Sequence, residues 1–231
     1  MTIGVRRFKK TFPMTSTSGK AFILIFFLLL ISACTTGRSP DRAFENYTLE
    51  YAPPAFDGLP QLNELLRVER FSAAQACNST AMLYRSGPSL LNAYAYHRWK
   101  AIPPDIVTDL ILRDLKRSGL FKAVFSEYDE ADARFVLQGR VEEFLEIEER
   151  GSRKALLALD ITLLDRSQRD TAKGVIFQRA YRALEPLDTP TPGAFARGMS
   201  RSMEKVSRPM TSDIYEAVKN LRKSEESKPA P

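Results

Sequence analysis

The stretch Arg134–Glu148, RFVLQGRVEEFLEIE, carries the clearest strand pattern in the chain. Apolar side chains recur at every second position, and charged or amide side chains fill the positions between them. This is the pattern of a strand with one buried face. The alternation assigns the following residues to the apolar face: Phe135, Leu137, Gly139, Val141, Leu145 and Ile147. Val136, Glu143 and Phe144 break the alternation, so the sequence predicts a β-bulge near Glu143.

Strand patterns continue on both sides of this stretch. Ala155–Leu164 is apolar on both faces except at Asp160 and Thr162, which is typical of a central strand, and Gly174–Ala183 completes a three-stranded meander. Two further strands and a hairpin are predicted upstream, at Tyr47–Tyr51, at Leu65–Phe71, and at Ala81–Arg85 with Ser89–Tyr94 around the turn sequence Ser86-Gly87-Pro88.

Two helices are also predicted. The first begins at Pro103-Pro104-Asp105, where proline and an acidic residue suit a first turn, and ends at Gly119. The second begins at Thr191-Pro192. Its apolar residues recur at steps of three or four: Phe195, Met199, Met203, Val206, Met210, Ile214, Val218 and Leu221. Pro209 lies within this series and predicts a kink or a short break. The order of elements predicts an α/β domain with a mixed sheet, a mid-chain helix and a long C-terminal helix.

The first 33 residues have the three parts of a secretory signal peptide. A basic segment, Met1–Lys20, precedes eleven apolar residues, Ala21–Ile31, and two small residues follow. The apolar run is shorter than the about 20 residues of a spanning helix, although an uncleaved short membrane anchor stays an alternative. The leader holds five of the chain's 34 basic residues and no acidic one, which leaves 29 basic against 28 acidic residues. The remainder is nearly neutral, and this argues against binding to nucleic acid.

The segment Leu30-Ile31-Ser32-Ala33-Cys34 resembles a bacterial lipobox. The resemblance implies that the Cys34 thiol receives a diacylglyceryl group, that the chain is cleaved before Cys34, and that the new amine is acylated. More than one hydrophobic chain is needed for stable membrane anchoring. Thr35 follows the cysteine. In lipoproteins of enteric type an aspartate at this position retains the protein in the inner membrane, so threonine favours the outer membrane, with the protein facing the periplasm.

The sequence therefore divides into four segments. Residues 1–33 form a lipoprotein-type signal peptide, 34–46 a lipidated polar tether, 47–222 one domain, and 223–231 a disordered tail. The tether residues Thr35–Asn46 have a root-mean-square span of about 20 Å as a flexible chain. Such a tether lets the domain stand clear of the lipid headgroups.

Motifs for catalysis and metal binding are missing from the sequence. His97 is the single histidine, and Cys77 is the only cysteine besides Cys34, so the common zinc and redox motifs cannot form. There is no glycine-rich phosphate loop and no nucleophile elbow. We therefore predict no catalytic residue, no cofactor and no metal, and Cys77 is interpreted as a buried cysteine. A lipid-anchored periplasmic enzyme and a structural envelope-binding lipoprotein remain as alternatives.

Several short motifs occur in a fixed order along the mature chain: Tyr47-Thr48-Leu49, Leu66–Phe71, Met82–Arg85, Tyr94 to Arg98-Trp99 with Pro103-Pro104, Ser118–Phe121 with Val124, and Ala131-Asp132 with Leu137, Gly139 and Phe144. Together they resemble the ABC-type transport auxiliary lipoprotein family, which includes PqiC-like outer-membrane lipoproteins. The resemblance implies a three-layer α/β domain with a mixed sheet, and it leaves a homo-oligomer open.

The resemblance also implies a function. Such lipoproteins are periplasmic accessories of ABC-type systems built around MCE-domain proteins, which move lipids or other hydrophobic molecules between the inner and outer membranes. The implied partner is the MCE-domain protein, and the role is docking rather than catalysis. Six residues of the motifs are candidates for structural or partner contacts: Tyr84, Arg85, Tyr94, Tyr96, Arg98 and Trp99. Trp99 is expected to pack where a strand passes into the first helix.

Overall fold

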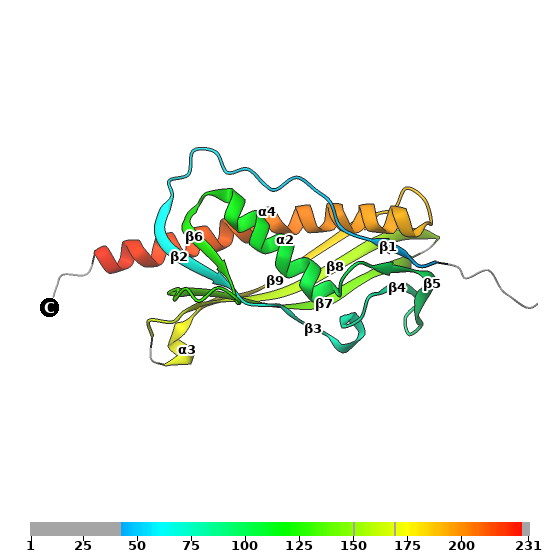
Figure 1. Cartoon of the computed structure of the whole chain (residues 1–231), viewed down its shortest axis with the longest axis horizontal. Coiled ribbons are helices and arrows are strands. Elements are labelled where there is room, and N and C mark those ends of the chain that lie inside the picture. The colour runs from blue at the N-terminus through cyan, green and yellow to red at the C-terminus, as the bar shows by residue number, and fades with distance from the viewer. Residues whose placement is uncertain (1–42, 150, 169, 228–231) are drawn as a thin grey trace, which may run out of the picture. The chain divides into compact units, whose positions relative to one another are not determined.

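The computed structural model describes residues 43–149, 151–168 and 170–227 (Figure 1). Phe44–Pro231 forms one compact unit with its own hydrophobic core. The predicted signal peptide, the lipidation site Cys34 and the tether up to residue 42 lie outside the described residues.

Within the described residues, nine strands form one mixed sheet. The strands are β1 (Glu45–Tyr47), β2 (Leu62–Val68), β3 (Ser72–Ala73), β4 (Ala81–Ser86), β5 (Leu91–Trp99), β6 (Phe121–Ser126), β7 (Phe135–Glu149), β8 (Ser152–Asp165) and β9 (Val175–Pro186). The helices are the short 3-10 helix η1 (Gln75–Cys77), α2 (Pro103–Ser118), α3 (Thr171–Gly174) and α4 (Pro192–Glu226).

Strand β7 organises the sheet. One edge of β7 pairs with β8 along its whole length in antiparallel orientation, and β8 pairs in turn with β9. The other edge is shared in series by three parallel strands: β2 pairs near Phe135, β3 at Arg140 and β4 near Ile147. On this edge of β7 the sheet therefore divides into two parts. One part consists of β2 and β6. The other consists of β4, β5 and β1, and we call it the N-terminal wing.

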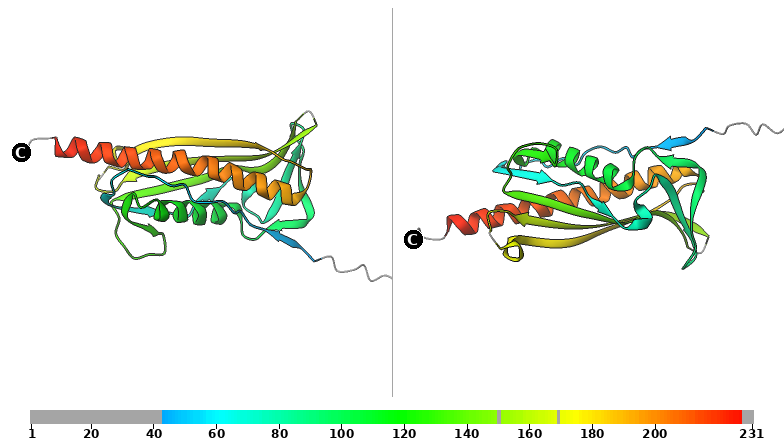
Figure 2. Two further views of the ribbon diagram at one scale, coloured as in Figure 1. Left: turned by 90° about the horizontal axis from the view of Figure 1, so that it is seen from above. Right: turned by 60° about the horizontal axis from the view of Figure 1, so that its bottom comes forward.

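Helices α2 and α4 lie on the same face of the curled sheet (Figures 1 and 2). Helix α4 packs on β8 and β9, and α2 packs on β6 and β7 and contacts α4. The apolar stripe of α4 is buried in the core, including the methionines Met199, Met203 and Met210. The mixed α/β fold predicted from the sequence, with a mid-chain helix and a long C-terminal helix, is confirmed. The three-layer arrangement implied by the family resemblance is not observed, because both long helices cover the same face and leave two layers.

The chain at the start of the domain differs from the prediction. Only Glu45–Tyr47 forms a strand, and it pairs in parallel with the end of β5. The following residues do not pair as the predicted strand Tyr47–Tyr51, because the Glu50 amide donates a hydrogen bond to Ser200 Oγ and Tyr51 Oη donates one to Asp114. The tether assigned to 34–46 therefore overlaps the domain, since its last two residues belong to β1.

Helix α4 passes through Pro209 without the predicted short break. Proline removes one backbone hydrogen bond, which costs about 3 kcal/mol in a helix interior. The residues on both sides of Pro209 hold the helix in place, because Val206 is 3 % exposed and Ser207 and Met210 are fully buried. Packing in the core therefore keeps the helix continuous.

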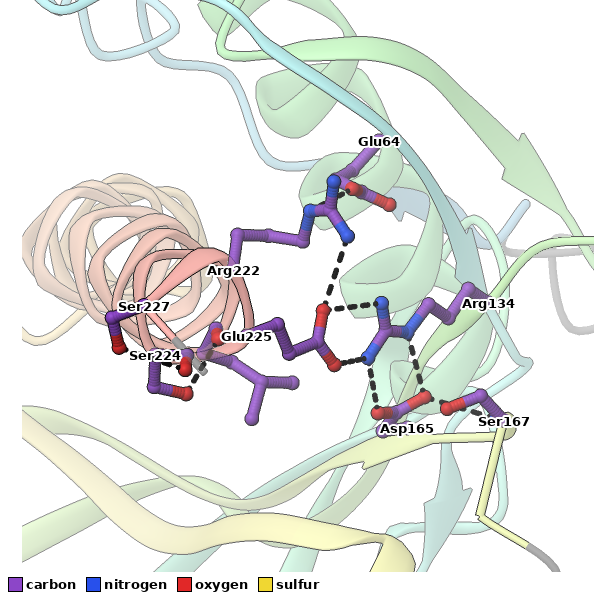
Figure 3. Close-up of polar contacts among 9 residues, drawn as sticks. Glu64, Arg134, Asp165, Ser167, Arg222, Ser224, Glu225 and Ser227 are labelled. Atoms are coloured by element: carbon purple, nitrogen blue, oxygen red, sulfur yellow. Dashed lines mark hydrogen bonds and ion pairs between the residues drawn. The ribbon is translucent and has the colours of Figure 1, made fainter. Parts of the chain in front are cut away.

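The C-terminal end of α4 also extends beyond the predicted boundary at residue 222. Lys223–Glu226, assigned from composition to a disordered tail, continues the helix. The physical reason is an ion-pair network that composition does not show (Figure 3). Arg134 Nη1 donates to Glu225 Oε2 over 3.0 Å, Arg222 Nη1 donates to the same carboxylate, and Arg222 Nε pairs with Glu64 over 2.7 Å.

The other side of Arg134 binds Asp165, and this pair predicts an acid dependence of stability. Hydrogen bonds from Arg134 at 2.7 and 2.9 Å hold the pKa of the buried Asp165 at about 2. Because the folded-state pKa lies below the unfolded value, the stabilisation is present above about pH 4 and is lost as the pH falls through 2. It amounts to about 2 kcal/mol. Urea unfolding at pH 7, 4 and 2 should therefore show a smaller loss of stability for Asp165→Asn than for the unchanged chain, and equal losses would contradict the assignment.

Candidate docking surface

Three of the six predicted contact residues point into the domain from the N-terminal wing. Trp99 is 1 % exposed and packs edge-on against Phe144 and Phe195, with ring centroids 5.1 and 5.2 Å away. This places the indole where β5 leads into α2, as expected. The rings of Tyr84 and Tyr94 pack at a tilt of 52°, with centroids 5.1 Å apart.

Tyr94 is part of a polar cluster around the buried Glu146, near the C-terminal end of β7. Its hydroxyl donates to Glu146 over 2.9 Å, and Arg153 donates to the other carboxylate oxygen over 3.0 Å. Burial raises the pKa of Glu146, and the hydrogen bonds from Tyr94 and Arg153 oppose that rise. His97 follows three residues later on β5. Its Nδ1 lies 3.3 Å from Tyr47 Oη and 3.2 Å from the Glu45 carboxylate. These contacts satisfy the polar groups locally, and they join β5 to β1 and to β7.

The other three predicted residues lie on the outer face of the wing. Arg98 places its guanidinium 3.5 Å from the centre of the Phe44 ring, and Phe44 and Tyr96 lie with centroids 6.4 Å apart. Arg85 binds Glu143 of β7 over 3.1 Å. The structure therefore divides the predicted set by face: Trp99, Tyr84 and Tyr94 support the fold, whereas Arg85, Tyr96 and Arg98 reach the surface.

The predicted bulge is present and changes the faces of β7. Val141 pairs with Leu159 and Glu143 with Ala158, so Glu142 is the extra residue. Beyond it Phe144 joins the core, and Leu145 and Ile147 turn to the outer face. Their assignment to the same face as Phe135 was wrong, because an inserted residue inverts a period of two.

This inversion creates an apolar row on the outer face of the sheet. Leu83, Leu145, Leu156 and Leu184 are direct neighbours in register across β4, β7, β8 and β9, and we call these four residues the outer apolar row. Three of them pack with Ile147 into a cluster separate from the main core. Leu184 closes the row and is 38 % exposed. The sequence analysis missed this row, although restarting the alternation after the bulge would have indicated it.

A chain of charges lies across the row. Glu143 binds Arg85 over 3.1 Å and Arg182 over 3.0 Å. Arg85 is in register with Ile147, so its side chain must pass Leu145 to reach Glu143. The long arginine side chain therefore covers an apolar surface that the main core does not use.

The described parts of the chain contain no group of three or more histidine, cysteine or acidic residues arranged to hold a metal ion. No helix among the described residues is long and apolar enough to cross a membrane. Cys77 is buried, and burial raises the pKa of its thiol, which disfavours the reactive thiolate.

Comparison with known proteins identifies the family and supports the fold. Residues 47–211 match the family described as ABC-type transport auxiliary lipoprotein component. The solved structure of protein XCC0632 from Xanthomonas campestris, of the family DUF330, is similar with a TM-score of 0.71 and 19 % identity, covering 78 % of this chain and 99 % of that one. A second structure, of an uncharacterized protein, has a TM-score of 0.57 and 11 % identity, covering 74 % and 99 %. At these identities the two structures support the fold alone. No curated protein matches the sequence. Because the family match spans well over half of the sequence, the chain belongs to the ABC-type transport auxiliary lipoprotein component family.

Proposed function

We propose that this auxiliary component is anchored by lipids on Cys34 in the outer membrane and faces the periplasm. There it docks the MCE-domain protein of an ABC system that moves lipids or other hydrophobic molecules between the two membranes. The family membership supports a role in ABC-type transport, and the lipobox-like segment before Cys34 supports the anchor.

The observation that carries the docking role is the outer apolar row. The inner face of the sheet already packs on α2 and α4, so Leu145 at 3 % and Leu156 at 0 % exposure add a second apolar cluster on the opposite face. Within this row Leu83 is half-buried and Leu184 is 38 % exposed, so these two side chains are the part of the row that a partner can reach. Apolar surface rimmed by charged side chains is typical of protein interfaces.

The anchoring part of the proposal predicts a complete loss of lipidation in Cys34→Ala, because the diacylglyceryl group is attached through the Cys34 sulfur and alanine has no thiol to receive it. The variant should stay unprocessed or accumulate as an aqueous periplasmic species. Mass spectrometry of the mature protein measures this directly. A mature chain with an unmodified Cys34 would overturn the anchor.

The docking part predicts that the cognate MCE-domain protein binds immobilised residues 35–231, which contain the whole compact domain. Binding should persist at about 0.5 M salt, where exposed charges are strongly screened. Leu184→Asp should weaken binding about tenfold or more, since burying an unpaired carboxylate at an interface costs well over 1 kcal/mol.

Val175→Asp is the matched control. Val175 is 37 % exposed and lies on the same strand as Leu184, which is 38 % exposed. It pairs with Leu164 at the opposite end of β8, far from the row. Binding of this variant should equal that of the unchanged chain. Equal losses in both variants, or no binding at either salt concentration, would defeat the docking role.

A further inference from the structure

We propose that the outer edge of the N-terminal wing rests on an anionic lipid surface, so that the folded domain itself contacts the membrane that holds its anchor. The inference rests on the proposed lipidation of Cys34 and adds a second membrane contact. This contact is made by Phe44 just before β1, by Tyr96 and Arg98 on β5, and by the β4–β5 hairpin. This contact fixes the orientation of the domain, which a tether alone does not.

The first observation is the distribution of exposed apolar side chains. Among the described residues, eight large hydrophobic side chains are exposed, and four of them belong to this wing or its hairpin. They are Phe44 at 44 %, Tyr96 at 43 %, Leu91 at 43 % and Leu90 at 55 %. Phe44 and Tyr96 pack together, and Leu90 and Leu91 lie where the hairpin returns into β5. The wing therefore concentrates apolar surface at one edge of the sheet.

The second observation is the chemistry beside these side chains. The Arg98 guanidinium lies on the Phe44 ring, and within residues 43–149, 151–168 and 170–227 it forms no ion pair. Lys100, two residues further on, is also exposed. The nearby acidic residue Glu45 is engaged with Tyr47 and His97, in register with His97 rather than with Tyr96 or Arg98. Aromatic rings with adjacent cations suit the interface of an anionic bilayer, where rings sit at the headgroup level and cations meet negative lipids.

The third observation is the position of the wing along the chain. Phe44 immediately precedes β1 and contacts β5, so only the nine residues 35–43 separate it from Cys34. Even fully extended, that length spans at most about 35 Å. Along the chain, Phe44 is thus the first residue of the compact unit to follow the proposed anchor. A bilayer is the occupant that this position favours over a protein partner.

The test uses the single tryptophan of the sequence as an internal control. The full chain, expressed with its leader and purified with its lipids, is reconstituted into vesicles of phosphatidylethanolamine with about a third phosphatidylglycerol, an anionic composition that attracts basic residues. Phe44→Trp introduces a probe at the wing, and Val175→Trp introduces one at the far end of β9. Trp99 is 1 % exposed and contributes a constant background. Lipids brominated near the headgroup then quench tryptophans that enter the interface.

We expect the emission of Trp at position 44 to fall by about half, since interfacial groups enter the bilayer by about 5–10 Å. The probe at position 175 should keep its emission. Arg98→Glu in the Phe44→Trp chain should abolish most of the quenching. A chain that does not float with the vesicles would refute the lipid anchor itself. A chain that floats but shows equal emission at both positions would overturn the membrane contact alone, as would a wing that is shielded only after the MCE-domain protein is added.

Discussion

Replacing Trp99 by alanine is expected to lower the free energy of unfolding by about 3–5 kcal/mol, the usual cost of emptying a large aromatic site in a core. Trp99 is almost fully buried and joins β5 to β7 through Phe144 and to α4 through Phe195. For a domain of this size the melting temperature should fall by about 10 °C or more. Thermal unfolding followed by circular dichroism measures the change.

Trp99→Phe separates packing from hydrogen bonding in this experiment. The indole Nε1 has no hydrogen-bond partner among the described residues, so phenylalanine removes volume without breaking a polar contact. Its loss of stability should be clearly smaller than that of alanine. If Trp99→Ala melted within a degree or two of the unchanged protein and lost only partner binding, Trp99 would be a contact residue and the packing assignment would be wrong.

The second large effect is expected at Gly139, in the middle of β7. A Cβ atom there would lie 2.2–2.4 Å from three atoms of the Phe71 ring. The ring cannot swing aside easily, because Phe71 is 1 % exposed and its backbone amide donates to Thr108 Oγ1 over 2.9 Å. Gly139→Ala should therefore cost about 3 kcal/mol or more, at the upper end of overpacking effects. Urea unfolding is the appropriate measurement.

Two further variants make the assignment specific. Phe71→Leu in the Gly139→Ala background should restore part of the lost stability, because the shorter side chain makes room for the methyl group, and the coupling follows from a double-mutant cycle. Gly193→Ala is the matched control, since its Cβ would meet nothing closer than 3.7 Å. Similar losses at both glycines would show that the loss reflects backbone freedom and not the Phe71 contact.

Local signals in the sequence predicted the two long helices, α2 and α4, and the meander, but not the short helices η1 and α3. Pro103 and Gly119 bound α2 as expected, with Gly119 in the left-handed region at a φ of 67°, and the strands β7, β8 and β9 follow one another along the chain. The parallel pairings could not be read in the same way. Strand β1 pairs with β5 about fifty residues later, and β4 pairs with β7 about sixty residues later. No local pattern encodes such contacts, because they are selected by the packing of the whole sheet.

For the same reason, local patterns in the sequence do not indicate the candidate surface. Tyr94, Arg98 and Trp99 all lie on β5, but the sequence named them only as candidates for structural or partner contacts and did not indicate which of them face the core. The outer apolar row depends on residues from four strands and on one extra residue, Glu142. Charge partners such as Glu225 for Arg134, 91 residues apart, are likewise invisible to composition. Composition therefore predicts a tail where α4 continues to Glu226.

The division of the sheet along β7 has a consequence for the exchange of amide hydrogens with solvent. The N-terminal wing and the β2–β6 part each pair with β7. No strand of the wing pairs with β2 or β6. The wing is held to β7 by four register pairs, whereas β8 is held by fourteen. Backbone amides of β4, β5 and β1 can therefore exchange through local opening of the wing. Those of β8 exchange only when the whole domain unfolds. One molecule would thus show two protection levels, with the less protected one at the end where the chain leads toward Cys34.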